Sequence, residues 1–521
     1  MTASEIKYPV GIQTFSDIIN GGYVYVDKTA LVYRLVSRGK YYFLSRPRRF
    51  GKSLLLSTLK AYFEGHKELF KGLFIENLEK DWKCYPVIHL SLSQYNPSEP
   101  ESLEKLLDNS FRRLEHEYGC EPTTESLSLR FGNIIYAVCK KTASQVVVLI
   151  DEYDAPLVAN LENEKVYDRF RNLLKAIYSN LKEMDEYIRF GMLTGVSRFS
   201  RMTIFSGINN LNDISLVPEY SEICGLTQKE IESAFRIGIE NLSKAMGTDI
   251  QGAVALLKEN YDGYHFTRNS VDIYNPFSLL LALDNCEIAP YWFRSGTPDF
   301  LVRRLRREKV LLAELLTENV NESAISDIDT FRTSILSLLF QTGYLTIKDY
   351  DARRKRYRLG VPNKEVESGL FSEMLAYNMD MDKYRVDNRI WDIRDALEDG
   401  NPDRALDMIR SMFAAVPANL TQNMPELYYE NNLFLVFRLI GIDARAEWWT
   451  ADGRIDMLLV LPSYIYIMEL KLDSTPEQAL AQIDSKDYSL QFRYDGRQIF
   501  KIGINYSRQT RNIDSWKIII V

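Results

Sequence analysis

The sequence predicts an α/β protein built from several domains. Its 521 residues exceed the ~100–200 residues of a typical single domain. In segment 41–64 a short apolar run precedes a polar loop and then helical spacing, while segment 146–150 is a continuous β-branched and aliphatic run typical of a central parallel strand. Segment 454–472 has two apolar runs that meet at a tight turn, which predicts a hairpin in a second sheet.

The composition is ordinary for a soluble globular protein, with 46% hydrophobic and 26% charged residues. Because the formal net charge is −7, a surface that binds nucleic acid must be a local basic patch. Three segments are candidates, residues 45–52, 302–309 and 352–358. Each has the alternative of a solvated helix or hairpin face.

The cysteines and the N-terminus indicate the compartment. The five cysteines are odd in number, scattered and without a CxxC pair, which indicates reduced thiols in a cytoplasm. None of the four histidines pairs with a cysteine at zinc-ligand spacing, so no structural zinc is expected. The first residues lack the pattern of a signal peptide, and the longest apolar run, 457–470, is too short to span a bilayer. We predict a cytoplasmic protein with no membrane partner.

The loop at residues 45–53 is similar to a phosphate-binding motif. A strand predicted at Tyr41–Leu44 precedes it and a helix ending near Gly65 follows, which is the context that GxxxxGK[ST] requires. Gly51, Lys52 and Ser53 match, whereas Arg46 occupies the first glycine position. In a nucleotide site Gly51 lets backbone amides approach the phosphates, Lys52 reaches the β and γ phosphates, and Ser53 holds magnesium. The alternative is a basic turn with a chance GKS.

Two later strands supply the partners that such a loop needs. The run from Val146 ends at Asp151 and Glu152, so Asp151 can hold magnesium and Glu152 can orient or deprotonate water. Asp154 is interpreted as a helix N-cap only. Another predicted strand ends at Thr194, which suits a polar sensor beside the phosphates. These three motifs, in this order, favour a P-loop ATPase over a dinucleotide fold, because no GxGxxG follows a strand.

Arg198 follows the third strand and has two interpretations. It can reach a γ-phosphate, in its own chain or a neighbouring subunit, or form a structural ion pair. Arg46, Arg48 and Arg49 would add positive charge around the same anion. The predicted ATP-binding residues are therefore Arg46, Pro47, Arg48, Arg49, Phe50, Gly51, Lys52, Ser53, Leu54, Asp151, Thr194 and Arg198, with Ser53 and Asp151 as magnesium ligands.

Several segments together carry a resemblance to a known family. "RPRRFGKSLLLSTLKAYFEG", "LIDEYDAPL", "LTGVSRFS", "YDGYHF" and "YNPFSLL", with residues 8–36, resemble the AAA-ATPase-like family of bacterial proteins that carry a C-terminal PD-(D/E)XK nuclease-like domain. The resemblance covers essentially the whole chain, and in that family RPRRFGKS is the usual form of the loop. It implies that Arg46 does not mark a dead site. Asp27 in "YVDKT" also matches, but a cap on the helix from Lys28 explains it locally.

The middle of the chain is predicted to be helical. Thr227 is expected to cap a helix, with Glu230 completing a capping box, and a helical lid is the simplest interpretation. The loop 261–280 packs either against the nucleotide or against the lid. Residues 334–375 read as helix, hairpin and helix, which favours a winged-helix-like module. Its basic wing, 352–358, has two open interpretations, contact with DNA or packing on the ATPase. Residues 380–418 are expected to form a helical connector.

The last hundred residues contain two carboxylates and a lysine on neighbouring strands. Pairing about Pro462 of strands 454–461 and 464–472 sets Asp456 beside or diagonal to Glu469, and the strand period puts Lys471 on the face of Glu469. Asp456 and Glu469 can bind magnesium, and Lys471 can position water or stabilise the charged transition state. The alternative is a surface ion pair worth ~0–1 kcal/mol.

The surroundings of this hairpin resemble the PD-(D/E)XK nuclease core. A helix that closes near Gly441 precedes it, and a helix with Gln482 and Lys486 on one face and a strand at 498–507 follow. The resemblance implies Asp456, Glu469 and Lys471 as the catalytic triad and Gln482 as an ancillary residue. The extra acid of the site is left open among Glu426, Glu430 and Glu447.

The sequence thus predicts a P-loop NTPase core with a parallel sheet at 1–225, a helical lid and winged-helix-like middle at 226–420, and a C-terminal α/β PD-(D/E)XK nuclease-like domain at 421–521. The expected function is an ATPase coupled to a Mg²⁺-dependent nuclease, with ATP and Mg²⁺ as cofactors, nucleic acid (DNA favoured) as partner, a homo-oligomeric assembly and a role in defence against mobile elements. The alternative is a nucleotide-dependent signalling or scaffold switch whose nuclease-like domain binds nucleic acid or protein without cutting. A transposon-type DNA manipulator is a third interpretation.

Overall fold

The protein divides into two compact units. The structure is a computed structural model that describes residues 6–99, 101–121, 125–198, 205, 210–268, 271–296, 301, 304–305, 315–316, 319–326, 334–379, 381–414, 426–441, 443–449, 454–492, 494–510 and 512–521. The N-terminal unit comprises Met1–Leu301 and Asn319–Glu365, and the C-terminal unit comprises Val302–Glu318 and Val366–Val521. The predicted domain boundaries near 225 and 420 remain predictions.

The N-terminal unit is built on a parallel sheet, as predicted. Its strand order is β2-β3-β4-β1-β5, with every strand parallel to its neighbours. The strands are β1 (Tyr41–Ser45), β2 (Val87–Ser91), β3 (Val146–Asp151), β4 (Ile188–Gly195) and β5 (Asn212–Asp213). Every residue of β1 and β3 is buried, which explains their unbroken apolar runs. Because β4 lies between β1 and β3, the carboxyl ends of these three strands meet at one edge.

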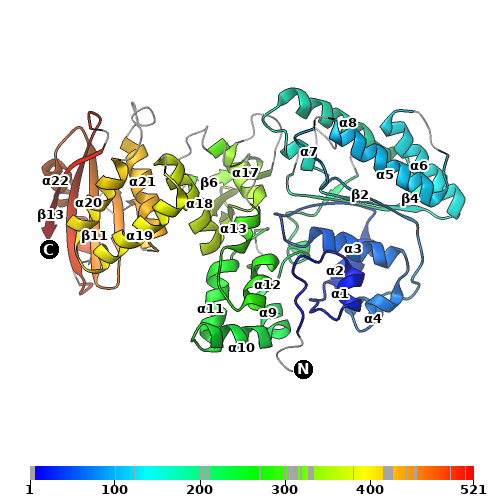
Figure 1. Ribbon diagram of the computed structural model, residues 1–521, viewed down its shortest axis with the longest axis horizontal. Helices are drawn as coiled ribbons and strands as arrows, with labels where there is room; N and C mark the ends of the chain where they lie inside the picture. Colours follow the sequence, from blue (N-terminus) through cyan, green and yellow to red (C-terminus); the bar gives the residue numbers. More distant parts are fainter. Residues whose placement is uncertain are drawn as a thin grey trace. The chain divides into compact units, whose positions relative to one another are not determined.

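Helices cover both faces of this sheet (Figure 1). On one side α3 (Lys52–Phe63) lies against β2, β3 and β4, with α1 (Phe15–Asn20), α2 (Thr29–Arg38) and α4 (Phe74–Leu78) beside it. The other side carries α5 (Ser102–Tyr118), α6 (Leu127–Thr142), α7 (Ala155–Val158) and α8 (Glu164–Glu183). The sheet is therefore the middle layer of a sandwich of helices, the arrangement expected of a parallel sheet.

Asp27 joins two of these helices. Its Oδ1 accepts hydrogen bonds from the amide of Thr29 at 2.8 Å and from the Thr29 hydroxyl at 2.6 Å, at the first residue of α2. Its Oδ2 accepts from the amide of Phe74 at the start of α4, at 2.7 Å. Asp27 therefore binds the first amide of α2 from one residue before the N-cap position, which belongs to Lys28, and α2 begins at Thr29 and not at Lys28 as predicted.

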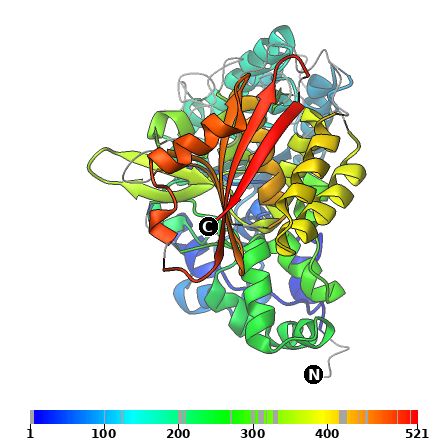
Figure 2. The same cartoon turned by 90° about the vertical axis from the view of Figure 1, so that its left-hand side faces the viewer.

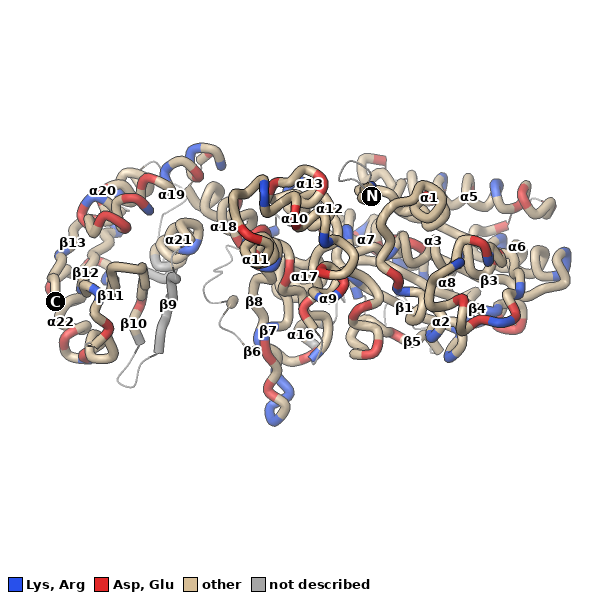
Figure 3. Tube along the Cα trace, turned by 90° about the horizontal axis from the view of Figure 1, so that it is seen from below, with Lys and Arg blue, Asp and Glu red and all other residues tan. Residues whose placement is uncertain are grey.

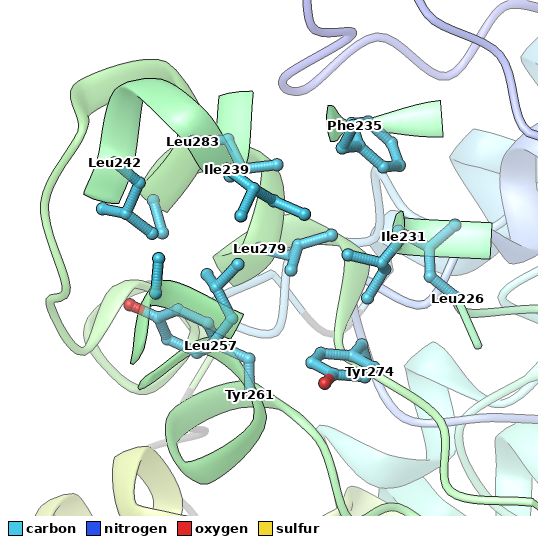
Figure 4. Close-up of a cluster of buried hydrophobic side chains, with 12 residues drawn as sticks. Leu226, Ile231, Phe235, Ile239, Leu242, Leu257, Tyr261, Tyr274, Leu279 and Leu283 are labelled. Carbon is cyan, nitrogen blue, oxygen red and sulfur yellow. The ribbon is translucent and has the colours of Figure 1, made fainter. Parts of the chain in front are cut away.

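A helical subdomain follows the parallel sheet, as predicted for the lid. It contains α9 (Gln228–Ala234), α10 (Arg236–Ala245), α11 (Ile250–Tyr261), α12 (Pro276–Asn285) and α13 (Tyr291–Gly296). Buried aliphatic and aromatic side chains from α9 to α12 interlock in its core (Figure 4). The capping box is confirmed, because Thr227 accepts from the Glu230 amide and Glu230 accepts from the Thr227 amide. Glu230 also pairs with Lys28 at 2.6 Å, which ties the lid to the start of α2.

The loop between α11 and α12 packs against the phosphate-loop segment. The ring of Tyr264 lies 4.8 Å from that of Phe50, and the ring of Phe266 lies 5.4 Å from it. The aromatic loop therefore contacts a residue of the 46–53 segment, a contact that neither sequence alternative included.

The helix, hairpin and helix predicted for the middle of the chain are present, and we call them the winged module. They are α17 (Ile335–Thr342), β7 (Thr346–Asp351) with β8 (Arg356–Gly360), and α18 (Lys364–Asn378). A short strand, β6 (Asn319–Asn321), completes an antiparallel sheet of order β6-β8-β7, and α16 (Glu322–Ser326) follows it. The backbone turns from α17 into β7 at Gly343, whose φ of +92° and close approach to Pro47 both require glycine.

Glu365 is a buried acid where lid and winged module meet within the N-terminal unit. It is 4% exposed, and its Oε1 accepts from the Trp292 amide at 2.6 Å. Burial raises the pKa of Glu365 to about 7, above the ~4.3 expected for an unfolded chain. The folded state therefore binds the proton more tightly, so stability is full below about pH 4.3 and is lost as the pH rises to about 7.

Glu365→Gln should remove this pH dependence. Glutamine keeps an acceptor for the Trp292 amide but carries no charge, so relative to wild type the variant should gain about 3 kcal/mol between about pH 4 and about pH 8. Urea unfolding at both pH values measures the difference. Glu259→Gln, in an exposed ion pair with Lys364, is the control. Parallel pH profiles of wild type and Glu365→Gln would contradict this assignment.

The C-terminal unit is a second α/β layer structure (Figure 2). Its five-stranded sheet has the order β13-β12-β11-β10-β9, in which only β11 and β12 are parallel. The strands are β9 (Asp443–Trp449), β10 (Arg454–Val460), β11 (Tyr464–Leu472), β12 (Gln498–Ser507) and β13 (Asn512–Ile520). In Figure 2, α22 (Pro476–Ser485) lies on one side of the sheet and α19 (Lys383–Glu398) and α20 (Pro402–Phe413) on the other, while α21 (Glu426–Leu439) packs on β9, β10 and β11. Both predicted strands, 454–461 and 464–472, are confirmed to within one residue.

Two sequence expectations concern the chain as a whole. All five cysteines are free thiols, as expected. Across the described ranges, none of the helices combines the length and the apolar character that a membrane crossing demands.

Candidate functional site

Ser53, Asp151 and Thr194 form a hydrogen-bonded cluster at the carboxyl edge of the parallel sheet. The hydroxyl of Ser53 donates to Asp151 Oδ2 at 2.5 Å, and the hydroxyl of Thr194 donates to Asp151 Oδ1 at 2.6 Å. The strand order explains the geometry. Thr194 is the penultimate residue of β4, Asp151 ends the neighbouring β3, and Ser53 is in the first turn of α3, which follows β1. Three residues predicted as nucleotide or magnesium ligands are thus within direct contact.

Lys52 lies under the loop that precedes α3. Its ammonium donates to the carbonyls of Arg46 at 2.9 Å and Pro47 at 3.0 Å. Burial lowers the pKa of Lys52, and the nearby Asp151 and Glu152 carboxylates oppose that shift. Gly51 has a φ of +95°, so the backbone can turn sharply into the helix. The positive end of the α3 dipole and the Lys52 charge therefore act in the same place.

A pocket of about 450 Å³ opens at this helix N-terminus. Its volume is in the range of small-molecule sites, ~300–1,000 Å³. Arg48 and Arg49 are exposed and contribute to its lining together with Lys52, Ser53 and Glu152. Glu152 has a φ of +50°, in the left-handed region, and burial raises the pKa of its carboxyl. An acid with a raised pKa is suited to accept a proton from water in this pocket.

A second, apolar pocket of about 110 Å³ adjoins the first, since both are lined by Gly51, Leu54 and Pro276. Its other walls include Tyr25, Val26, Cys224, Leu226 and Phe235. Sequence reasoning missed these residues because they come from three distant segments. Only the helical lid, which supplies Phe235 and Pro276, was predicted.

The structure corrects the predicted role of Arg46. Its guanidinium is 2% exposed and donates to the carbonyls of Ser45 and Ser215 at 2.9 and 2.8 Å and of Tyr220 at 3.2 Å. It also stacks on the Phe266 ring at 4.2 Å. Burial lowers the pKa of Arg46 to about 10, so it stays charged at neutral pH. The side chain holds the loop to the sheet edge, and Arg46 and Pro47 line a different pocket from Arg48 and Arg49.

Arg46→Met should therefore destabilise the fold more than Arg48→Met. The first variant leaves three buried carbonyls without their donor, at a cost of about 3 kcal/mol or more. The second changes an exposed side chain, so its stability should stay within about 0.5 kcal/mol of wild type. Urea unfolding at neutral pH measures both. Equal stabilities of the two variants would refute the structural role.

Two other predicted residues have structural partners. Asp154 is in the N-cap position of α7 but its side chain makes no capping bond. Its carboxylate accepts instead from the amides of Val196 at 3.1 Å and Ser197 at 2.6 Å, so the cap interpretation is wrong and Asp154 fixes the chain after β4. Arg198 pairs with Asp213 at 2.8 Å, which is the structural alternative of the prediction. Its amide donates to Gln341 Oε1 at 2.6 Å.

The C-terminal unit brings Asp456, Glu469 and Lys471 together. The register Met457 to Met468 makes Asp456 and Glu469 direct cross-strand neighbours. Asp456 Oδ2 accepts from the Leu470 amide at 2.9 Å. The Lys471 ammonium donates to Glu469 Oε1 and to the Leu470 carbonyl, both at 3.1 Å. The predicted convergence of two carboxylates and a lysine is present.

Burial distinguishes this cluster from a surface ion pair. Glu469 is 0% exposed and Asp456 is 9% exposed. Burial, and then the Asp456 charge, raise the pKa of Glu469 to about 7. Glu469 Oε2 is buried and has no hydrogen-bond partner within the part of the chain that the structure describes. Two adjacent carboxylates with an unsatisfied oxygen fit a hard divalent cation, which would supply the missing contact.

No group of three or more His, Cys, Asp or Glu side chains among the described residues is arranged as a metal cage. The side chains of Glu426, Glu430 and Glu447, the candidates for the extra acid, lie outside the described residues.

Gln482 is half-buried in the last turn of α22, the helix that packs on β11 and β12. Over the described part of the chain, no hydrogen bond joins its side chain to the acidic cluster, so its ancillary role stays a prediction. Gly503, which sequence reasoning missed, pairs in register with Glu469. A Cβ at Gly503 would lie 2.2 Å from the Pro476 carbonyl, so glycine is what lets α22 approach the sheet beside the cluster.

Comparison with known proteins agrees with this division of the chain. Residues 9–205 match the model of a predicted AAA-ATPase family, and residues 424–516 match a PD-(D/E)XK nuclease superfamily model. The matches contain the Ser53–Asp151–Thr194 cluster and the Asp456–Glu469–Lys471 cluster, respectively. A protein of Azotobacter chroococcum mcd 1, described as "Uncharacterized protein in vnfD 5'region", is 35% identical over 520 residues, 98% of each chain. The chain belongs to the AAA-ATPase-like family whose members end in a PD-(D/E)XK nuclease-superfamily domain.

Proposed function

We propose that the protein is an ATPase coupled to a magnesium-dependent nuclease that acts on nucleic acid, with DNA the favoured substrate. The observation that carries the proposal is the buried pair Asp456 and Glu469 with Lys471 beside it, in the same chain as the Ser53–Asp151–Thr194 cluster. Family and geometry support both halves.

In the ATPase half, the pocket at the start of α3 accepts the triphosphate. Backbone amides after Gly51 and the ammonium of Lys52 bind phosphate oxygens, and Arg48 and Arg49 add charge at the mouth. Ser53 and Asp151 would hold Mg²⁺, which neutralises charge on the phosphates when bound. Glu152 accepts the proton of the attacking water and Thr194 positions it. The adjoining apolar pocket has a lining suited to a nucleobase.

In the nuclease half, Asp456 and Glu469 would hold Mg²⁺, which when bound would act as a Lewis acid toward a phosphodiester. Lys471 donates hydrogen bonds from the edge of the cluster and can stabilise charge on the phosphate as it develops. Glu469 must be ionised to bind the cation, and the raised pKa of this carboxyl makes that step sensitive to pH near 7.

A second candidate is a nucleotide-dependent switch whose nuclease-like domain binds without cutting. Contacts of both modules near the nucleotide pocket favour it. The Trp292 indole of the lid donates to the Arg48 carbonyl of the phosphate loop at 3.0 Å, and Gln341 of the winged module accepts from the amide of Arg198, just after β4. Nucleotide binding beside these segments can therefore bias the position of both modules. In this case Glu469→Gln should leave the biological function unchanged.

The test is incubation of purified protein with DNA and with RNA, in the presence of Mg²⁺ and ATP. Cleavage that disappears in EDTA, and that is absent from a Lys471→Ala preparation, supports the nuclease. Equal cleavage by wild type and Lys471→Ala indicates a contaminating enzyme and removes the nuclease half. Homo-oligomerisation and a cytoplasmic location, the latter based on the free cysteines, stay parts of the proposal. The role in defence against mobile elements rests on family analogy.

A further inference from the structure

The β7–β8 hairpin ends in a basic tip. Residues 351–358 contain five basic residues and one acidic residue, in a chain whose net charge is −7. Arg353, Arg354, Lys355 and Arg356 are all exposed. Figure 3 shows this tip extending from β7 and β8 with its basic positions at the end, and Figure 2 shows the same hairpin standing out from its neighbours.

The tip is held in one conformation by its own residues. Asp351 Oδ1 accepts from the amides of Arg353 at 2.9 Å and Arg354 at 3.0 Å, and these bonds lower the pKa of Asp351. Lys355 has a φ of +52°, which closes the turn. Acidic side chains compensate few of the cations. Among the described residues, the tip forms ion pairs from Arg354 to Asp351 at 3.9 Å and from Arg358 to Asp349 at 4.0 Å, which are long and exposed and therefore weak.

The base of the hairpin is rigid. The rings of Tyr350 and Tyr357 lie 4.7 Å apart, and Tyr357 is 2% exposed. The guanidinium of Arg268 lies 5.0 Å from the Tyr350 ring and donates to its hydroxyl at 3.1 Å. Because the backbone that carries the cations is already ordered, binding a partner orders the exposed side chains without the added cost of ordering a loop.

We propose that this hairpin tip binds the sugar-phosphate backbone of a nucleic acid. Arginine is suited to phosphate because its planar guanidinium donates two parallel hydrogen bonds to one group. Because the rest of the chain is net acidic, a polyanion is steered to this place. Contacts of this kind position a nucleic acid without reading its sequence.

The nucleic-acid assignment rests on the proposed function, since the C-terminal unit carries a candidate phosphodiester site. A lipid surface is a poorer match to the same charge. The apolar residues of segment 351–358 are Ala352 and the buried Tyr357, so the tip has no side chain to insert into a bilayer.

The test compares two variants of equal charge change. The tip variant replaces Arg353, Arg354, Lys355 and Arg356 with glutamine. The control variant makes the same replacement at four exposed lysines, Lys67, Lys71, Lys80 and Lys83. Fluorescence anisotropy measures binding of a labelled duplex of about 30 base pairs, as DNA and as RNA, in EDTA so that no cleavage occurs. The tip variant should bind at least ~10-fold more weakly near 150 mM salt, and its slope of log K against log salt should fall by up to about 3.6. The control should stay within about twofold of wild type.

Unchanged affinity and salt slope in the tip variant, with the control also unchanged, would overturn the proposal. So would a variant that loses binding to phosphatidylserine vesicles but keeps binding to both duplexes. Circular dichroism and nucleotide binding at wild-type levels show that the tip variant is folded. A chain that binds through the tip but never cleaves refutes the nuclease and leaves the tip assignment standing. If the protein cleaves nucleic acid but the tip variant binds it as tightly as wild type, the tip assignment is refuted and the nuclease stands.

Discussion

Lys52→Ala is expected to weaken ATP binding by about 100-fold and to abolish phosphate release. The Lys52 ammonium is buried at the start of α3 and lies against the loop carbonyls that shape the pocket. Loss of a charged contact to a phosphate in such a place costs about 3 kcal/mol, which corresponds to a factor of ~100 in affinity. Binding of a fluorescent ATP analogue and the release of inorganic phosphate measure the two effects.

The matched control for this variant is Lys60→Ala. Lys60 is on the same helix but its side chain is 43% exposed and pairs with Glu64, so nucleotide affinity should not change. Lys52→Met keeps the length of the buried chain and separates loss of charge from loss of packing. Wild-type phosphate release by both Lys52 variants, in preparations that unfold like wild type, would contradict the assignment of the pocket.

Glu469→Gln is expected to lower metal-dependent cleavage by about 1,000-fold or more, while the fold stays intact. Glutamine has nearly the same shape but offers one neutral oxygen in place of a carboxylate, so the cation loses a charged ligand in a buried site. The stability of the metal-free variant should not fall at neutral pH, because burial raises the pKa of the native Glu469 to about 7 and already disfavours its ionised form. Glu477→Gln, at an exposed position of α22, is the control.

Cation binding and stability should both depend on pH because the pKa of Glu469 is raised. A proton competes with the cation for this carboxylate, so affinity for Mn²⁺ should fall as the pH is lowered through about 7. Without the cation, the folded state binds the proton more tightly than the unfolded chain, and stability should decrease from about pH 4.3 to about pH 7 and then level off. Calorimetric titration with Mn²⁺ at about pH 6 and about pH 8 measures the first effect. A pH-independent affinity would argue against Glu469 as a ligand.

Much of the fold was predictable because its signals are local. The apolar runs of β1, β3 and β4, the capping box at Thr227 and the D…ExK hairpin each lie within a short segment. The approach of Ser53, Asp151 and Thr194 was predicted only as an order of motifs, because no local residue states that β4 inserts between β1 and β3.

The remaining features depend on residues far apart in the chain. Arg46 occupies a glycine position of the motif, and its burial requires carbonyls at Ser215 and Tyr220, more than 160 positions away. Glu365 is buried by α12 and α13, and Gly503 is needed only because α22 crosses β12 at that point. A propensity or a motif cannot reveal such partners, since tertiary packing selects them.

The proposed function depends most directly on metal-dependent cleavage of nucleic acid by the Asp456–Glu469–Lys471 cluster. The decisive measurement is the rate of DNA and RNA cleavage with Mg²⁺ and ATP by wild type, Glu469→Gln and Glu477→Gln purified in parallel. We predict cleavage by wild type and Glu477→Gln that falls to background in Glu469→Gln. Cleavage by Glu469→Gln at the wild-type rate, or none by any of the three under all metal and nucleotide conditions, would contradict it.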